Sequence, residues 1–364
     1  MRILVDICHP AHVHLFKHAI RQLREHGHFV VVTVKDIPAA KKLLEYEEID
    51  FISLPGSKKD SLAGKAWTQC RDLYHLGRIV RSHRVEIGIG SSVSVAQLGR
   101  LMGFPSLFFD DDDDAVEPLT LRFAHPFAHV VLSPAALKDH RKKNPTVFYP
   151  GSHELAYLHP KQFVPEPAVL ESIGLNMEMP FFVMRFNAFK AHHDGNVRGL
   201  TLQQKLELIS MLEPHGRVLI TTERSIENEL RSYQMNIPPH QIHHLLYYAT
   251  LFIGDSQTMT SEAAILGTPA LRCNTLVGQL SVIEELTHRY QLAYGFQPEA
   301  FDAMKETIRV LLSNTHLKDE WQTKRNLFLA DKIDVTAFFV WFIEHYPESQ
   351  AMILQQPDFF FSFY

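Results

Sequence analysis

Short apolar runs alternate with amphipathic stretches along almost the whole chain. The runs have the length of buried strands, and several stretches between them repeat apolar residues at helical spacing. Strands that alternate with helices are typical of parallel sheets, because a parallel connection must cross back over the sheet. The pattern therefore predicts an α/β fold with parallel sheets and helical crossovers.

The first half of the chain contains one such series. Val13, Phe16 and Ile20 recur at helical spacing, and Gly27 follows as a C-terminal glycine cap. A proline-rich polar segment after Gly151 indicates a connection between domains. The strands predicted before it are 3–7, 29–34, 51–54, 86–89, 106–109 and 130–132.

A second series begins near residue 181. Its predicted strands are 181–184, 218–221, 251–253 and 270–272, with helices near 202–212, 226–233 and 335–345. The architecture expected from both series is two Rossmann-like domains facing a cleft. The domain boundaries predicted from the sequence are 1–155, a connection over 156–180, 181–330, and a C-terminal helix and aromatic tail over 331–364 that packs back on the first domain.

Composition narrows the class of protein. A chain of 364 residues, 46% of them apolar, is long enough for two cores. A net charge of −5 offers no basic field for nucleic acid. Three scattered cysteines favour neither disulfides nor a thiolate metal site. No run approaches the roughly 20 apolar residues that span a bilayer, and no signal-peptide pattern opens the chain, so a reducing cytoplasmic compartment is expected.

The stretch 251–271 carries the strongest chemical signal. An apolar strand runs into Ser256, Thr260 and Ser261, where a helix is expected to begin. Unpaired backbone amides and the helix dipole make such a start an anion site. Glu262, expected in the same first turn, can accept two hydrogen bonds from a ribose diol. Diphosphate plus ribose is the recognition handle of a nucleotide-sugar.

The turn after the first strand contains His9, His12 and His14. Ligands sit outside the carboxyl ends of strands in open parallel sheets, so this turn is expected to face the cleft. Its imidazoles could cap the helix, bind a metal, or act as a general base or phosphate contact. His12, at the tip of the turn, is the preferred catalytic candidate.

Asp110 to Asp114 follow another strand. Three interpretations remain open: a solvated loop that caps the next helix, a pair of aspartates that binds Mg²⁺, or one carboxylate whose pKa its neighbours raise. The second domain opens with a loop that contains Arg185, His192 and His193, which suit a diphosphate unless this is an ordinary basic surface loop.

The C-terminal Asp358–Tyr364 is exposed-looking, aromatic and too short to span lipid. Packing against the body of the protein is expected, and a contact with a membrane surface or a second copy in a homodimer is the alternative.

These motifs resemble the GT-B superfamily of nucleotide-sugar enzymes. The stretch 255–269 is similar to the donor-binding region of UDP-N-acetylglucosamine 2-epimerases. More closely, residues 1–294 resemble a bacterial and archaeal family of unknown function, through the phrases at 9–14, 154–160 and 185–194 and through Thr258-Met with Glu262-Ala-Ala. The His12-Val13 pair also resembles the Gly-His-Val of lipid-linked N-acetylglucosaminyltransferases.

The resemblance to the epimerases implies that Ser256 contacts diphosphate, that Glu262 holds the ribose, and that His192 or His193 approaches the nucleotide. Asp113 falls where the epimerases have a catalytic glutamate. Two epimerase motifs are replaced, by the histidine turn and by Asp111–Ala115. The departures weigh against epimerase chemistry and leave donor binding intact.

The function expected is therefore transfer of a sugar from a nucleotide-sugar, preferably UDP-linked, to an unidentified envelope or lipid-linked acceptor. Arg185, Ser256, Thr260, Ser261 and Glu262 would hold the donor, with His12 or Asp113 as base. The nucleotide-sugar is a substrate, and no cofactor or metal is required. A sugar-nucleotide 2-epimerase and a non-catalytic nucleotide-sugar binding protein are the alternatives.

Overall fold

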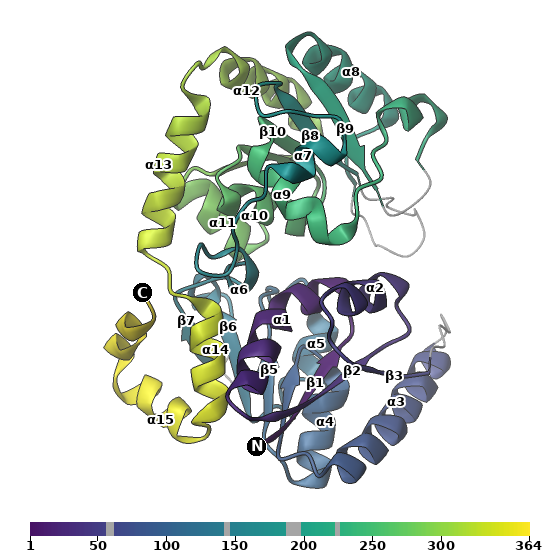
Figure 1. Ribbon diagram of the computed structural model, residues 1–364, viewed down its shortest axis with the longest axis vertical. Coiled ribbons are helices and arrows are strands. Elements are labelled where there is room, and N and C mark those ends of the chain that lie inside the picture. The colour runs from purple at the N-terminus through teal and green to yellow at the C-terminus, as the bar shows by residue number, and fades with distance from the viewer. Residues whose placement is uncertain (56–61, 142–145, 187–197, 223–225) are drawn as a thin grey trace. The chain divides into compact units, whose positions relative to one another are not determined.

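The computed structural model describes residues 1–55, 62–141, 146–186, 198–222 and 226–364. The chain forms two compact units: unit 1 consists of Met1–Gln162 with Lys332–Tyr364, and unit 2 of Phe163–Asp331. Each unit is built on its own parallel sheet, and helices flank both sheets (Figure 1). The α/β class predicted from the sequence is confirmed.

The unit 1 sheet has the strand order β3-β2-β1-β4-β5-β6-β7, and all neighbours are parallel. The order reverses direction between β1 and β4, because β2 lies on one side of β1 and β4 on the other. In open α/β sheets ligands bind beyond the carboxyl ends of the strands at such a reversal point. The strands are β1 Arg2–Ile7, β2 Phe29–Val34, β3 Ile52–Ser53, β4 Ile87–Gly90, β5 Ser106–Phe109, β6 Val130–Pro134 and β7 Thr146–Tyr149.

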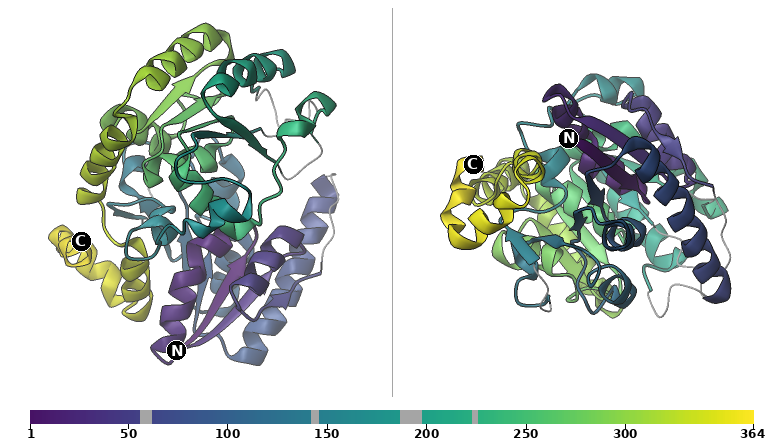
Figure 2. Two further views of the ribbon diagram at one scale, coloured as in Figure 1. Left: turned by 45° about the horizontal axis from the view of Figure 1, so that its top comes forward. Right: turned by 90° about the horizontal axis from the view of Figure 1, so that it is seen from below.

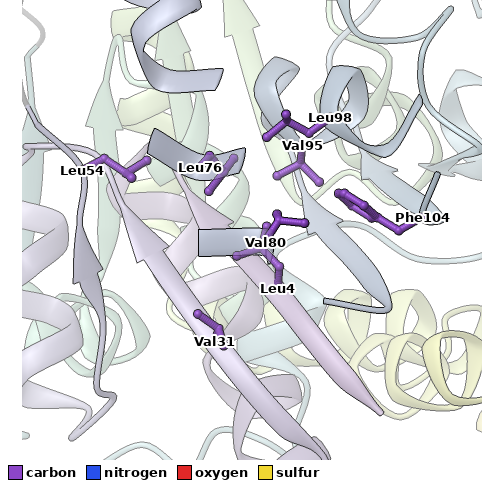
Figure 3. Packing of buried hydrophobic residues seen from close by; sticks show 8 residues of the cluster. All are labelled: Leu4, Val31, Leu54, Leu76, Val80, Val95, Leu98 and Phe104. Atoms are coloured by element: carbon purple, nitrogen blue, oxygen red, sulfur yellow. The ribbon is translucent and has the colours of Figure 1, made fainter. Parts of the chain in front are cut away.

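Helices cover both faces of this sheet. On one face, Leu76 and Val80 of α3 and Leu98 of α4 pack around Leu4 of β1 (Figure 3). The helices of unit 1 are α1 Pro10–Glu25, α2 Pro38–Tyr46, α3 Leu62–His83, α4 Val93–Met102, α5 Pro118–Phe123, α6 Leu155–Leu158, α14 Val335–Glu344 and α15 Glu348–Gln355, with 3₁₀ turns at Ala135–Leu137 and Pro357–Phe363.

The C-terminal segment completes the other face of the unit 1 sheet. The ring of Phe109 on β5 lies 5.1 Å from Phe16 of α1 and 4.6 Å from Phe339 of α14, centroid to centroid. Figures 1 and 2 show α14 beside α1. In the tail, Phe360 and Phe363 are buried while Phe361 is 67% exposed.

The unit 2 sheet has the order β12-β11-β10-β8-β9, again parallel throughout, and reverses between β8 and β10. Its strands are β8 Phe181–Arg185, β9 Arg217–Thr221, β10 Leu251–Gly254, β11 Ala270–Cys273 and β12 Ala293–Phe296. Its helices are α7 Ala168–Ser172, α8 Leu202–Leu212, α9 Ile242–Tyr248, α10 Gln257–Leu266, α11 Ser281–Glu284, α12 Phe301–Ser313 and α13 Leu317–Ala330. Between these lie 3₁₀ turns at Glu213–His215, Asn228–Tyr233, Pro239–Gln241 and Pro298–Ala300 and a π-helical turn at Glu285–Arg289.

Several elements differ from the sequence-based expectation. The strands β7 and β12 were not predicted, since both are short edge strands with mixed burial. The helix predicted near 226–233 is a 3₁₀ turn at Asn228–Tyr233. The residues of the predicted connection 156–180 are divided between the two units: those up to Gln162 belong to unit 1 and the rest to unit 2. Among the described helices, none combines the length and apolar character needed to cross a membrane.

Candidate functional site

The amino-terminus of α10 lies at the reversal point of the unit 2 sheet. Ser256 is the N-cap residue of this helix, and its Oγ accepts a hydrogen bond from the backbone N–H of Met259 at 3.4 Å. The N–H groups of the first turn have no carbonyl one turn earlier to bind, and the helix dipole adds positive potential there. The place predicted from the sequence as an anion site is therefore a helix start at the carboxyl end of β10.

A glycine brings the two strands at this reversal point close together. A Cβ at Gly254, the last residue of β10, would overlap the carbonyl oxygen of Arg185 at the end of β8. The same carbonyl accepts the N–H of Asp255 at 3.1 Å. The side chain of Arg185 is half-buried at this edge, so the structure brings Arg185 and Ser256 to the ends of adjacent strands.

The remaining donor-site candidates on α10 are buried. Thr260 donates its hydroxyl to the Ser256 carbonyl at 2.6 Å, which stabilises the helix start. Ser261 is 2% exposed. Glu262 is the sixth residue of α10, so its expected position in the first turn is wrong: the helix begins at Gln257, after its cap.

Glu262 has a partner that the sequence did not indicate. Nε2 of His243, on α9, lies 2.9 Å from Oε1 of Glu262, and both side chains are about 5% exposed. The sequence suggested only that the His243–Tyr248 stretch could pack on a base or belong to a helix core. His192 and His193, the other donor-site candidates, lie outside the described residues.

In unit 1, the predicted histidine turn becomes the start of α1. His9 is the N-cap, and its Nδ1 accepts from the N–H of Ala11 at 3.2 Å. His14 is buried with its ring 5.3 Å from that of Tyr157. His12 therefore lies within the first turn of the helix and not at the tip of a loop.

The surroundings of His12 define which of its nitrogens carries a proton. The N–H of Cys8 points at Nδ1 at 3.5 Å, and the Cys8 sulfur lies 3.4 Å from the same atom. Burial, with the neighbouring His9 and His153, lowers the pKa of His12 to about 3. A neutral imidazole that accepts at Nδ1 carries its proton on Nε2, so His12 presents a hydrogen-bond donor at that nitrogen.

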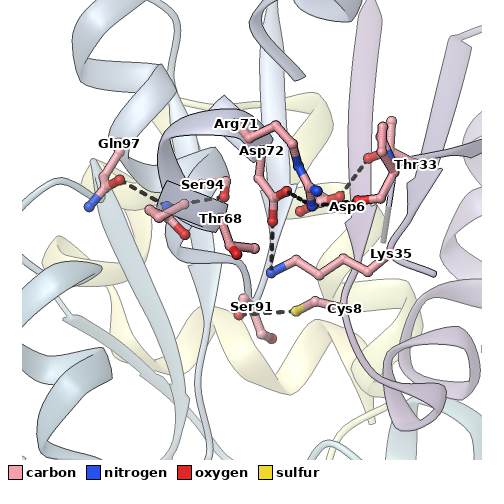
Figure 4. Close-up of polar contacts among 12 residues, drawn as sticks. Asp6, Cys8, Thr33, Lys35, Thr68, Arg71, Asp72, Ser91, Ser94 and Gln97 are labelled. Carbon is pink, nitrogen blue, oxygen red and sulfur yellow. Dashed lines mark hydrogen bonds and ion pairs between the residues drawn. The ribbon is translucent and has the colours of Figure 1, made fainter. Parts of the chain in front are cut away.

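A polar network ties this turn to the reversal point between β1 and β4 (Figure 4). The thiol of Cys8 donates to the carbonyl of Ser91, beyond β4, at 3.7 Å. Asp6 of β1 is fully buried, and its carboxylate accepts a hydrogen bond from the Thr33 hydroxyl at 2.6 Å. Burial raises the pKa of Asp6. The network holds the start of α1 in place.

The five consecutive aspartates separate into different environments. Oδ2 of Asp110 accepts from Nε2 of His125 at 2.6 Å and from Arg141 at 2.8 Å. Burial alone would raise the pKa of Asp110, but the bond from His125 and the charge of Arg141 lower it. Asp113 is buried, and its backbone carbonyl accepts the N–H groups of Val116 and Glu117. The interpretation as a uniformly solvated loop is therefore wrong.

Carboxylate oxygens of Asp110, Asp111 and Asp112 lie within 4.8 Å of one another, which is a spacing a cation can bridge. The oxygens of Asp110 and Asp111 already contact positively charged or protonatable side chains, Arg141 and His153 among them. A metal ion would have to compete with these partners.

Two residues beyond β7 join this group, and neither was a candidate from the sequence. Nδ1 of His153 lies 3.1 Å from Oδ1 of Asp111. Burial opposes protonation of His153, but the negative charge of Asp111 and the bond to it outweigh burial. The pKa of His153 is therefore raised. Burial and the charge of Asp111 raise the pKa of Glu154 to about 7. A signal was present, since Pro150-Gly-Ser-His-Glu154 follows the β-branched and aromatic run Thr146–Tyr149. Without a predicted strand there, the sequence analysis could not place these residues at a sheet edge.

Comparisons with known proteins agree with the fold. A putative UDP-N-acetylglucosamine 2-epimerase from Listeria monocytogenes has a TM-score of 0.64 at 15% identity, over 88% of this chain and 90% of that chain. The spinosyn rhamnosyltransferase solved with thymidine diphosphate has a TM-score of 0.58 at 14% identity, over 95% of this chain and 100% of that chain.

At the sequence level, an uncharacterised protein from Methanocaldococcus jannaschii is 23% identical over 289 residues, which cover 74% of this chain and 81% of that protein. Residues 1–329 match the family described as "Protein of unknown function (DUF354)". These proteins and the two parallel sheets lead to one conclusion: the chain belongs to the DUF354 family and has a GT-B fold.

Proposed function

We propose that this protein is a glycosyltransferase that takes its sugar from a nucleotide diphosphate-sugar, preferably UDP-linked, and delivers it to an envelope or lipid-linked acceptor. The observation that supports this proposal is the start of α10, which Ser256 caps at the reversal point of the unit 2 sheet. First-turn amides and a helix dipole there suit a diphosphate.

In this proposal unit 2 binds the donor. Ser256 and the α10 amides contact the diphosphate, and Arg185 adds a permanent cation at the end of β8. Glu262 binds the ribose hydroxyls, with its orientation set by His243. Thr260 and Ser261 shape the helix start, because both are buried within it. His192 and His193 follow β8 in sequence and complete the set of proposed nucleotide contacts.

Unit 1 would supply proton transfer and the acceptor site, with His12 and Asp113 as the base candidates from the sequence. The leaving diphosphate gains negative charge in the transition state, which the helix start and Arg185 stabilise. No metal is needed for that role, so transfer is expected to continue in EDTA.

A sugar-nucleotide 2-epimerase is the second candidate. Such an enzyme would use a carboxyl group whose pKa lies near neutrality. Glu154, whose pKa is raised to about 7 beside Asp111, is the observation that favours it. A non-catalytic nucleotide-sugar binding protein remains the third candidate and requires only unit 2.

The test begins with calorimetric titration of the whole protein with UDP. Ser256→Ala removes the cap and is expected to weaken UDP binding about tenfold, since bonds to charged groups contribute about 1.5–3 kcal/mol. Thr201→Ala is the matched control, because Thr201 caps α8 of the same unit by the same kind of bond and does not follow β10. Equal UDP affinity in wild type and Ser256→Ala would contradict the proposed donor site.

Product analysis with a UDP-sugar then separates the candidates. A transferase yields free UDP and a glycoside. A hydrolysing epimerase yields free UDP with an epimerised sugar, a non-hydrolysing epimerase yields the epimeric UDP-sugar, and a binding protein yields none of these. The transferase is expected in the presence of EDTA. Loss of turnover on chelation, restored by Mg²⁺ or Mn²⁺, would instead assign a metal to Asp110–Asp112.

A further inference from the structure

Buried polar atoms without a hydrogen-bond partner gather at the carboxyl end of β7. Within the described residues, Tyr149 Oη, His153 Nε2 and Glu154 Oε2 have no such partner although each is buried. Buried polar groups in proteins are nearly always paired, because an unpaired one loses the hydrogen bonds it had with water. Three such unpaired atoms in neighbouring residues indicate a functional role, and the chemistry of His153 accounts for it.

The bond between His153 and Asp111 defines the tautomer of the imidazole. Nδ1 faces the carboxylate at 3.1 Å, and a carboxylate only accepts, so Nδ1 carries the proton. In the neutral ring Nε2 then carries no proton and has a free lone pair. Among the described residues, this atom has no hydrogen-bond partner. A carboxylate that orients an imidazole in this way also stabilises the imidazolium that forms when Nε2 takes a proton.

His12 has the opposite arrangement. Its Nδ1 faces the Cys8 N–H, so the proton of its neutral ring is on Nε2. His12 can therefore donate a hydrogen bond to a substrate oxygen but has no lone pair at Nε2 to receive a proton. The electrostatic influence of His153 on His12 indicates that the two rings belong to one group of residues in unit 1.

We propose that His153, oriented by Asp111, is the residue that accepts the proton from the acceptor hydroxyl. The inference rests on the proposed transferase function and names a catalytic residue for it. As the acceptor oxygen bonds to the anomeric carbon, its proton moves to Nε2 of His153. The bond from that carbon to the diphosphate breaks, its electron pair leaves with the diphosphate, and His153 then releases the proton to solvent. Asp111 is a positioning residue.

The charged groups around His153 determine how it titrates. Asp111 contacts Nδ1, while Glu154 and Asp110 contribute negative charge and raise the pKa of His153. Among the described residues, Asp112 and His12 are further titratable groups whose charges interact with His153. Removal of the Asp111 charge is therefore expected to lower the pKa of His153 and to shift the acidic limb of the pH profile toward lower pH.

The experiment uses the full chain with UDP-N-acetylglucosamine as donor probe and water as acceptor, with UDP release as the rate. His153→Gln is expected to reduce this rate about 10²–10⁴-fold while UDP affinity stays within twofold of wild type. Asp111→Asn is expected to reduce the rate, to move its acidic limb to lower pH, and to lower the His153 pKa measured by NMR of the imidazole protons. His140→Gln and Asp139→Asn, exposed changes in the same unit, are the controls.

The outcomes distinguish this inference from the proposed function. A wild-type protein that fails to bind UDP overturns both. If wild type and His153→Gln bind UDP equally and release it at equal rates, only the role of His153 is overturned. An unchanged His153 pKa in Asp111→Asn likewise overturns the orienting role of Asp111. A larger loss of the UDP-release rate in His12→Gln than in His153→Gln would assign the role of general base to His12.

Discussion

Asp110 and Asp111 are neighbours in the sequence, yet their partners give them different chemistry. Asp110 is bound between Arg141 and His125, where its charge is neutralised locally. Asp111 contacts His153, whose second ring nitrogen has no partner among the described residues. The first carboxylate is therefore suited to stabilising the fold and the second to orienting His153.

The stabilising role of Asp110 predicts a destabilised variant. Asp110→Asn is expected to lower the free energy of unfolding at pH 7 by about 3–5 kcal/mol, because Arg141 would stay buried without its main counter-charge. The pKa of Asp110 is lowered in the folded protein. Its contribution is thus present above the unfolded pKa of about 3.9 and is lost as pH falls below that value.

Denaturant unfolding between pH 3 and 7 measures this effect. The difference between wild type and Asp110→Asn is expected to narrow below about pH 4. Asp139→Asn, an exposed change, is expected to stay within about 0.5 kcal/mol of wild type. A difference that does not depend on pH would contradict the ionic role of Asp110.

A second prediction at the scale of single residues concerns Glu262. Glu262→Gln keeps the shape of the side chain and a weaker bond from His243, so the fold is expected to persist with a loss of about 1–2 kcal/mol. UDP affinity is expected to fall several-fold, because the amide replaces one of the two carboxylate acceptors with a donor. Calorimetry with UDP checks this, and unchanged affinity would remove Glu262 from the ribose.

At the scale of elements, both sheets use a glycine at the strand where their order reverses. Gly90 ends β4 with a positive φ of 147°, and a Cβ there would lie 2.9 Å from the Asp6 carbonyl oxygen on β1. Gly254 ends β10 against Arg185 of β8 in the same manner. Close approach of the two backbones places the following helix starts, α4 and α10, at the carboxyl edge of each sheet.

Gly254→Ala tests this requirement. The added Cβ is expected to push β10 from β8, to destabilise unit 2 by about 1–3 kcal/mol, and to weaken UDP binding as the α10 start moves. Gly77→Ala is the matched control, since its Cβ on α3 would meet only ordinary contacts at 3.6 Å and 3.7 Å. That control is expected to be neutral or to stabilise by about 0.5–1 kcal/mol. Thermal unfolding and UDP calorimetry on both variants provide the comparison.

At the scale of the whole molecule, the two units differ in continuity along the chain. Unit 2 is a single segment, Phe163–Asp331, whereas unit 1 needs residues from both ends of the sequence. Phe338, Phe339 and Phe342 from the C-terminal segment are fully buried in unit 1. The stability of unit 1 therefore depends on residues that the chain contributes last.

A chain that ends at Asp331 is expected to lose the fold of unit 1 and to keep UDP binding through unit 2. Phe339→Ala, a smaller change, is expected to destabilise unit 1 by about 3–5 kcal/mol through the cavity it leaves. Phe361→Ala at a 67% exposed position is the control and should change stability little. Scanning calorimetry and UDP titration measure both quantities, and native stability of the truncated unit 1 would contradict the prediction.

Local patterns in the sequence were enough for the fold class, most strands and the start of α10. Alternating apolar runs and a cap such as Ser256 act through neighbouring residues, so their consequences can be recognised along the chain. The tertiary structure alone decided which distant residues meet: His243 with Glu262, His153 with Asp111, and Arg141 with Asp110. Tautomers and pKa shifts follow from those pairings and from burial, and both depend on residues that folding brings together from distant parts of the chain.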